Sequence, residues 1–128
     1  MILGISGGKD SGVVAGLFVE ALGKENVLGV TMPCHSKEED KTDAKLVSDY
    51  YGFELINFDI TNTFDAFKNE LSGLGDFSEE NTKNSDINLK PRLRMATLYY
   101  LAALYSSLKG ETYLVAGTSN KCELYVGY

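Results

Sequence analysis

Cysteine, proline and histidine are scarce in this 128-residue sequence, which also has no tryptophan. Its two cysteines, Cys34 and Cys122, lie far apart and form no CxxC motif, so the sequence argues against a disulfide framework and favours a reducing compartment. The single histidine, His35, follows a proline and a cysteine, and we interpret it as a solvated loop residue rather than a general base. A cytoplasmic protein that uses neither thiol nor histidine chemistry is therefore expected.

Positive charge and long apolar runs are also scarce. Twelve basic residues against 18 acidic ones give a formal net charge of −6, which disfavours a nucleic-acid surface but still allows a locally positive pocket for a small anion. No apolar run is long enough to span a bilayer, and residues 1–5 show neither a basic leader nor a cleavage site. We therefore expect no membrane association and no nucleic-acid partner, and at this length a single domain with a real core.

The apolar residues alternate between short β-prone runs and helical periodicity, a pattern that predicts a Rossmann-like α/β fold with a parallel sheet and helices on both faces. With right-handed crossovers, four strands fit the order 3-2-1-4. A ligand would then bind between the loops that follow the first and fourth strands. The expected strands cover residues 2–6, 27–32, 54–58 and 113–116, and the expected helices cover about 11–22, 40–51, 61–71 and 88–108.

Single residues predict where the last long helix begins, and apolar residues at helical spacing predict which faces of the helices are buried. Asn88 is expected to cap the last long helix, with Pro91 in its first turn and a polar loop or lid over residues 73–86. The chain is expected to close without a terminal helix, and both ends have the character of a piece cut from a longer protein. Apolar stripes at helical spacing are expected on the first and last helices: Val13, Val14, Leu17, Phe18, Ala21, Leu22, Leu98, Leu101, Tyr105 and Leu108.

The sequence Ser6-Gly7-Gly8-Lys9-Asp10-Ser11 lies between the first expected strand and the first expected helix. Glycines let backbone N–H groups approach phosphate oxygens, and the helix N-terminus adds partial positive charge. The serines offer hydroxyl donors and Lys9 a cation. Because phosphate repels an acid unless a cation lies between them, we interpret Asp10 as a Mg²⁺ ligand. The alternative is a strand-to-helix turn in which Ser6 or Asp10 merely caps the helix.

A second polar loop, residues 117–123, follows the fourth expected strand. Thr118 offers a hydroxyl donor, and Glu123 offers a carboxylate that would complete a Mg²⁺ site with Asp10, phosphate oxygens and water. The plain alternative is a polar loop with a surface glutamate. On the preceding helix, Arg92 presents a planar fork for an anionic substrate, whereas Arg94 points to nearly the opposite side and is interpreted as part of a buried structural ion pair.

Three motifs in order resemble a known family. Residues 6–11 resemble the PP-loop of the ATP pyrophosphatases, whose fold is adenine nucleotide alpha hydrolase-like. Residues 88–95 (NLKPRLRM) with 98–100 (LYY) are similar to the NxKxRxRM…LYY segment of ammonia-dependent NAD synthetases, and residues 117–124 (GTSNKCEL) with 127–128 (GY) to their GTSNKSEL…GY segment. The resemblance covers essentially the whole chain, which is identified as one PP-loop nucleotide-binding domain, residues 1–128.

The resemblance implies a ligase that forms NAD from deamido-NAD, ATP and ammonia through an adenylated intermediate, with release of pyrophosphate and AMP and with Mg²⁺ as the metal. It assigns Arg92 to deamido-NAD, and Asp10 and Glu123 to Mg²⁺. Because the family is dimeric, a homodimer is expected. The residues assigned to ATP are Gly4, Ser6, Gly7, Gly8, Lys9, Asp10, Ser11, Met32 and Thr118.

Two departures from the family leave alternatives open. Lys9 stands where many members carry an uncharged residue and gives the SGGKDS loop of several tRNA-thiolating enzymes, although the lack of a CxxC motif argues against that class. The family usually continues beyond the GY segment with a Gly-Asp loop and with later lysine and threonine residues that contact both substrates. The alternatives are another PP-loop adenylating enzyme of the tRNA thiolase type and a non-catalytic nucleotide-binding fragment.

Overall fold

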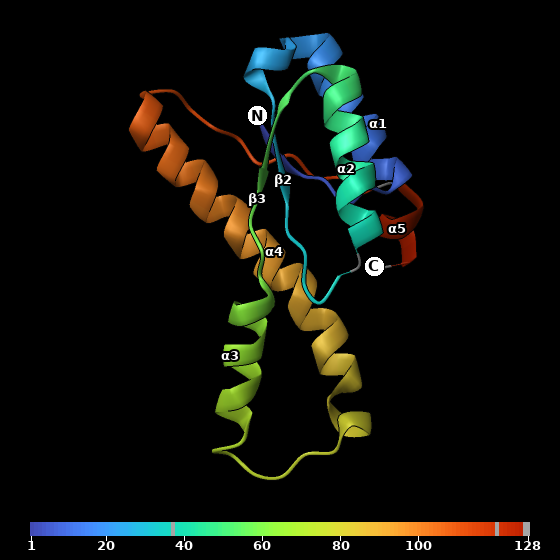
Figure 1. Cartoon of the computed structure of the whole chain (residues 1–128), viewed down its shortest axis with the longest axis vertical. Coiled ribbons are helices and arrows are strands. Elements are labelled where there is room, and N and C mark those ends of the chain that lie inside the picture. Colours follow the sequence, from blue (N-terminus) through green and yellow to red (C-terminus); the bar gives the residue numbers. More distant parts are fainter. Residues whose placement is uncertain (37, 120, 127–128) are drawn as a thin grey trace.

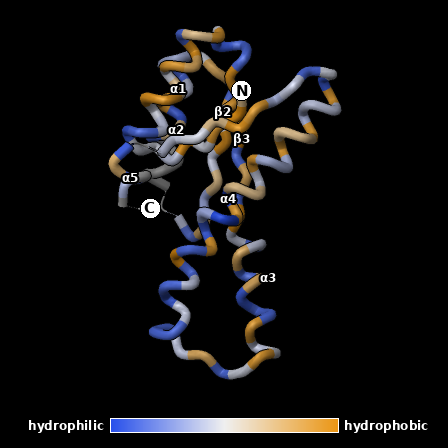
Figure 2. Tube along the Cα trace, turned by 180° about the vertical axis from the view of Figure 1, so that it is seen from behind, coloured by the Kyte–Doolittle hydropathy of each residue, from blue (hydrophilic) through white to orange (hydrophobic). Residues whose placement is uncertain are grey.

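The computed structural model describes residues 1–36, 38–119 and 121–126, without the side chains of residues 38–41, 124 and 126. Its sheet has three parallel strands, β1 (Ile2–Gly4), β2 (Leu28–Thr31) and β3 (Glu54–Asn57), with β2 in the centre. Each strand lies within a segment expected from the sequence, and each is shorter than expected. The strands are the apolar centre of the molecule (Figure 2).

Helices cover both faces of this sheet (Figure 1). On one face, α1 and α2 pack over Leu3 and Val27. On the other face, the long helix α4 crosses the strands and contacts Ile2 and Val30. The helical elements are α1 (Lys9–Leu22), the 3₁₀ turn η1 (Lys24–Asn26), α2 (Glu38–Tyr51), α3 (Thr61–Leu71), α4 (Glu79–Lys109) and α5 (Lys121–Val126).

The expected fourth strand is reduced to a single parallel bridge between Ile2 and Val115. The Ile2 N–H donates to the Leu114 carbonyl at 2.8 Å, and the Ala116 N–H donates to the Ile2 carbonyl at 2.8 Å. Segment 113–116 meets β1 at this one bridge, whereas β1 pairs with β2 over three residues. The described sheet therefore has three strands in the order β1-β2-β3, and segment 113–116 is joined to β1 by this bridge alone.

Helix α4 begins much earlier than the sequence suggested. Ser78 is its N-cap, and the Ser78 hydroxyl accepts a hydrogen bond from the Asn81 N–H at 3.4 Å. The prediction that Asn88 caps this helix was wrong: Asn88 lies inside α4, where its Nδ2 donates to the Asn84 carbonyl at 2.8 Å. Pro91 accordingly lies in the helix interior rather than in the first turn. The polar loop expected over residues 73–86 is a loop as far as Ser78 and helical beyond it.

The apolar stripe expected on α1 was partly wrong, because Val14 and Phe18 pack against the core but other members of the stripe do not. Ser11 and Ala15 are buried, whereas Val13 and Leu17 are 59% and 64% exposed. The reason is close packing by small residues, since a Cβ atom at Gly16 would lie 2.6 Å from the ring of a tyrosine at the end of α2. The stripe on α4 was also partly wrong, because Leu98 and Leu101 are buried but Leu108 is 70% exposed.

Two further features complete the fold. A short helix, α5, forms where the sequence predicted a polar loop and no terminal helix. Helix α3 and the first part of α4, residues 79–92, extend together away from the sheet and are called here the α3–α4 arm (Figure 1). Among the described residues, none of the helices is long and apolar enough to cross a membrane.

Candidate functional site

The loop after β1 is held in shape by its two serines. The Ser11 hydroxyl donates to the Gly8 carbonyl at 3.1 Å and accepts from the Ser6 N–H at 3.3 Å. The Ser6 hydroxyl accepts from the Gly8 N–H at 3.2 Å and lies 3.2 Å from the Ser11 hydroxyl. Gly7 has a φ of +82°, a conformation that side chains other than glycine rarely adopt. The serines therefore organise the loop internally, in addition to any ligand they bind.

Helix α1 begins at Lys9 directly after this loop, with Gly8 as its N-cap. Its first backbone N–H groups and their partial positive charge therefore lie beside the loop. Both Lys9 and Asp10 are exposed in this first turn. The described geometry is that of a glycine-rich turn that opens a helix, which is a suitable place for an anion.

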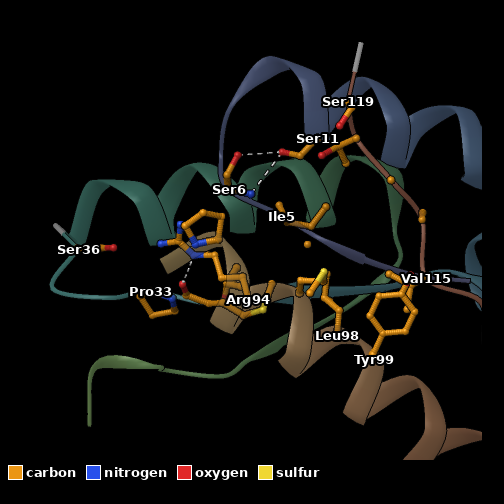
Figure 3. A pocket seen from close by; sticks show the side chains of 18 residues that line it. Ile5, Ser6, Ser11, Pro33, Ser36, Arg94, Leu98, Tyr99, Val115 and Ser119 are labelled. Atoms are coloured by element: carbon orange, nitrogen blue, oxygen red, sulfur yellow. Dashed lines mark hydrogen bonds between the residues drawn. The ribbon is translucent and has the colours of Figure 1, made fainter. Parts of the chain in front are cut away.

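A pocket of about 620 Å³ lies against this loop (Figure 3). Its walls come from the end of β1 with its loop, the end of β2 with its loop, the middle of α4, and segment 115–119. Five of the predicted ATP-binding residues line it: Gly4, Ser6, Ser11, Met32 and Thr118. The other predicted residues, Gly7, Gly8, Lys9 and Asp10, lie on the loop and in the first turn of α1 and do not line the pocket.

The pocket has a polar side and an apolar side. Ser6, Ser11 and Ser119 lie together at one side, and Leu98, Tyr99 and Val115 lie at another (Figure 3). A ligand with an apolar ring and an anionic tail matches this division. The pocket also includes Ser36, Met95 and Tyr99, which the sequence motifs did not single out as site residues.

Arg94 reaches the pocket from α4. Its Nε donates to the Met32 carbonyl at 3.0 Å, and its side chain is partly buried. Among the described residues Arg94 forms no ion pair, so the buried ion pair expected from the sequence is not found there. Arg94 is the one charged side chain among the described residues that line the pocket.

Arg92 lies elsewhere. Its side chain is exposed, and its Nη1 donates to the Asn88 carbonyl one turn back along α4 at 2.8 Å. It lines a second cavity of about 740 Å³ within the α3–α4 arm, together with Phe67 and Phe77. An ion pair between Lys68 and Asp86 also lies in this cavity. The structure therefore does not bring Arg92 into the pocket beside Ser6.

The two carboxylates predicted to bind Mg²⁺ lie at the starts of two helices. Asp10 is exposed in the first turn of α1, and Glu123 is partly buried in the first turn of α5. In the described part of the chain, no three histidine, cysteine or acidic side chains gather into a group that could hold a metal by themselves. Two hard oxygen donors fit Mg²⁺ if substrate phosphates and water supply its other ligands. Asn120, which lies between Thr118 and Glu123 in the sequence, is outside the described residues.

The loop after β2, residues 33–36, is fixed to the start of α3. The His35 N–H donates to the Thr61 hydroxyl at 3.1 Å, and His35 Nε2 lies 2.7 Å from Asp65 Oδ1. His35 has a φ of +50°, and its side chain is 52% exposed. It is thus half exposed, as expected for a loop histidine, but it is also paired. Because Ser36 and Pro33 line the pocket, this anchoring fixes one of the pocket's walls.

Cys34 belongs to this loop, but its side chain is buried in the core and does not line the pocket. Burial raises the pKa of the Cys34 thiol, while the nearby charges of Lys90 and Arg94 lower it by less. Cys122 is exposed on α5. Both cysteines are free thiols, and the sequence had argued against a disulfide framework.

A family model described as NAD synthase matches residues 1–128. The chain belongs to the NAD synthase family. It is 45% identical to the NH(3)-dependent NAD(+) synthetase of Methanococcus aeolicus, over 100% of this chain and 47% of the relative. The chain thus spans about half the length of the curated relatives it matches.

Solved structures of this family share the fold described here. An NH3-dependent NAD synthetase from Campylobacter jejuni, in complex with a nitrate ion, matches with a TM-score of 0.78 and 40% identity, over 99% of this chain and 50% of that one. A glutamine-dependent NAD+ synthetase from Acinetobacter baumannii, in complex with ADP, matches with a TM-score of 0.83 and 32% identity, over 100% of this chain and 23% of that one.

Proposed function

We propose that this chain is the nucleotide-binding part of an ammonia-dependent NAD synthetase. The observation that carries the proposal is the pocket that joins Ser6 and Ser11 of the glycine loop to Met32 and Thr118, in a chain that belongs to the NAD synthase family. ATP would bind with its base toward the apolar side and its phosphates toward the serines and the start of α1. The ADP complex of the Acinetobacter baumannii relative supports an adenine nucleotide as ligand.

The reaction would proceed in two steps. The nicotinate carboxylate of deamido-NAD forms a bond to the α-phosphorus of ATP while the bond to pyrophosphate breaks, and ammonia then displaces AMP to leave the amide of NAD. No protein nucleophile is required. Ser6, Ser11, Lys9 and the N-terminus of α1 would hold and neutralise the terminal phosphates. Asp10 and Glu123 would hold Mg²⁺, which stabilises the charge of the departing pyrophosphate.

Several finer features belong to the same proposal. Arg92 would contact deamido-NAD, which requires its Nη1 to exchange the Asn88 carbonyl for substrate. Segment 113–116 would extend its single bridge into a fourth strand beside β1, giving the order 3-2-1-4. The protein would be a cytoplasmic homodimer, and residues 1–128 would form one PP-loop nucleotide-binding domain.

The proposal is tested by titrating the 128-residue chain with ATP, with and without Mg²⁺, and measuring binding by calorimetry. We expect binding that Mg²⁺ strengthens, and we expect Asp10→Ala to remove most of the effect of Mg²⁺ because it removes a metal ligand. Glu20→Ala removes one carboxylate from the same helix and is the matched control. This variant should keep the full effect of Mg²⁺ on ATP binding. Equal binding of Mg-ATP by the wild type and by Asp10→Ala would contradict the assignment of the metal site.

The substrate class is tested by following pyrophosphate release from ATP. Release that depends on deamido-NAD supports the proposed synthetase, and release that depends on tRNA would support the tRNA thiolase alternative. We expect binding of Mg-ATP but little NAD formation by this chain alone. Binding without release in the presence of either substrate would favour the nucleotide-binding fragment.

A further inference from the structure

Arg94 has an unexpected place in the pocket. The other described lining residues are serines, threonines, glycines, prolines and apolar residues, so that the guanidinium is the one formal charge they contain. The chain as a whole carries a net charge of −6 at pH 7. A small anion that enters this pocket therefore meets a single fixed cation in an otherwise anionic protein, and interacts with it more strongly than it would in water.

The guanidinium is also held in a defined orientation. The bond from Arg94 Nε to the Met32 carbonyl joins α4 to the end of β2 and fixes the plane of the fork. Among the described residues, Nη1 and Nη2 of Arg94 have no hydrogen-bond partner. Figure 3 shows the side chain extending toward Ser36 and Ser6, away from Val115 and Tyr99. Two donors with parallel N–H bonds therefore face the polar side of the pocket.

The part of a bound nucleotide that Arg94 would contact is indicated by the walls of the pocket. Ser6, Ser11 and the start of α1 form one wall, which suits the terminal phosphates. Arg94 comes from α4, is bonded to the carbonyl of Met32, a predicted ATP-binding residue, and extends toward Ser6 (Figure 3), so its guanidinium lies between Met32 and those serines. We propose that Nη1 and Nη2 of Arg94 bind the α-phosphate of the nucleotide, the phosphate next to the ribose, an inference that rests on the proposed function.

This contact would act on the reacting atom itself. When the substrate carboxylate bonds to the α-phosphorus and pyrophosphate departs, negative charge on the non-bridging α-oxygens is stabilised by the guanidinium. A contact of this kind differs from the role of Arg94 in holding the Met32 carbonyl. Loss of the Met32 bond would weaken every ligand with an adenosine group, whereas loss of the phosphate contact would weaken only ligands with an α-phosphate.

The test compares AMP with adenosine in NMR titrations of the ¹⁵N-labelled chain at fixed ionic strength without added metal. We expect the wild type to bind AMP about tenfold or more tightly than adenosine, as a charge-assisted pair of hydrogen bonds provides. Arg94→Gln should bring this ratio close to one. Arg94→Lys, which keeps the charge and loses the fork, should give an intermediate ratio. Lys90→Gln, a matched loss of charge one turn away on α4 and outside the pocket, should keep the wild-type ratio.

The possible results separate failure of the Arg94 inference from failure of the proposed function. If the wild type binds nucleotide and Arg94→Gln keeps the AMP-to-adenosine ratio, the inference is wrong and the proposed function stands. If Arg94→Gln weakens both ligands equally, Arg94 positions Met32 and does not contact phosphate. If the wild type binds neither AMP, adenosine nor ATP, both proposals are wrong. If Arg94→Gln does not fold, an unchanged ratio in Arg94→Lys overturns the inference.

Discussion

At the scale of single residues, the glycine loop depends on an internal network as much as on its glycines. Ser11 is buried and makes three hydrogen-bond contacts with Ser6 and Gly8, so the loop keeps its shape through its own hydroxyl groups. In the described residues, all buried side-chain nitrogen and oxygen atoms have a hydrogen-bond partner. A preformed loop of this kind loses little conformational entropy when phosphate binds.

A pH dependence of stability follows from Cys34. Burial raises the pKa of this thiol in the folded chain above its ordinary value near 9.0, so the unfolded chain loses the proton first as pH rises. The folded state then binds more protons, and the free energy of unfolding falls as pH rises above about 9, by up to about 1.4 kcal/mol per pH unit. Urea unfolding between pH 7 and pH 10 measures this slope.

The contribution of Cys34 is isolated by comparing variants. Cys34→Ala should remove part of the slope above pH 9, although it also lowers stability at every pH because it leaves a cavity. Cys122→Ala, at the exposed cysteine, should keep the wild-type slope. A slope that is unchanged in Cys34→Ala would show that other groups account for the loss of stability at high pH.

At the scale of elements, Pro91 is a weak point of α4. A proline inside a helix has no N–H to donate and crowds the preceding turn, which costs about 3 kcal/mol relative to alanine. Its lower entropy in the unfolded chain offsets about 1 kcal/mol. Pro91→Ala should therefore raise the free energy of unfolding by about 2 kcal/mol in urea denaturation. Ser107→Ala, also at an exposed position of α4, should change it by less than about 0.5 kcal/mol.

Destabilisation by Pro91→Ala would show that the ring is retained for its packing. Pro91 borders the pocket beside Arg94, so this outcome would mean that ring contacts there outweigh the cost to the helix. The nucleotide titrations described above, repeated on Pro91→Ala, would then report how much of the pocket's shape depends on the proline.

The elements that the sequence predicted correctly are those with a clear apolar period. All three strands and the helices α1, α2 and α3 lie where expected. The start of α4 was missed because residues 79–86 are all polar and show no apolar period. A capping serine and two first-turn glutamates carry the signal instead. The core-facing side of α1 was predicted only in part, through Val14 and Phe18, because its fully buried positions are small residues that a hydrophobic period does not detect.

For the candidate site, the sequence predicted which loops meet but not every side-chain contact. The positions of Ser6, Ser11, Met32 and Thr118 around one pocket follow from the loops at the carboxyl edge of the sheet. Arg94 points away from Arg92, as expected, but its partner is the Met32 carbonyl, because a long side chain from the middle of a helix can reach another element and sequence spacing does not specify which one. The roles of these residues toward ligands stay predictions.

At the scale of the whole molecule, many large apolar side chains are exposed. They occur on both sides of the sheet, for example Leu17 on α1, Tyr50 on α2 and Tyr100 on α4, which are 64%, 83% and 69% exposed. Surfaces of this kind favour association. The net charge of −6 on each copy opposes it, because like charges repel at low salt.

We therefore expect a homodimer whose formation strengthens with salt. Light scattering should give about twice the 14.0 kDa of one chain, and the apparent mass should rise between low and moderate ionic strength as repulsion is screened. Leu17→Glu and Tyr100→Glu place the same charge on opposite sides of the sheet at exposed positions, so neither should change the free energy of unfolding of the monomer much. The variant that lowers the mass identifies the interface. A mass of one chain at every concentration and salt would contradict the dimer.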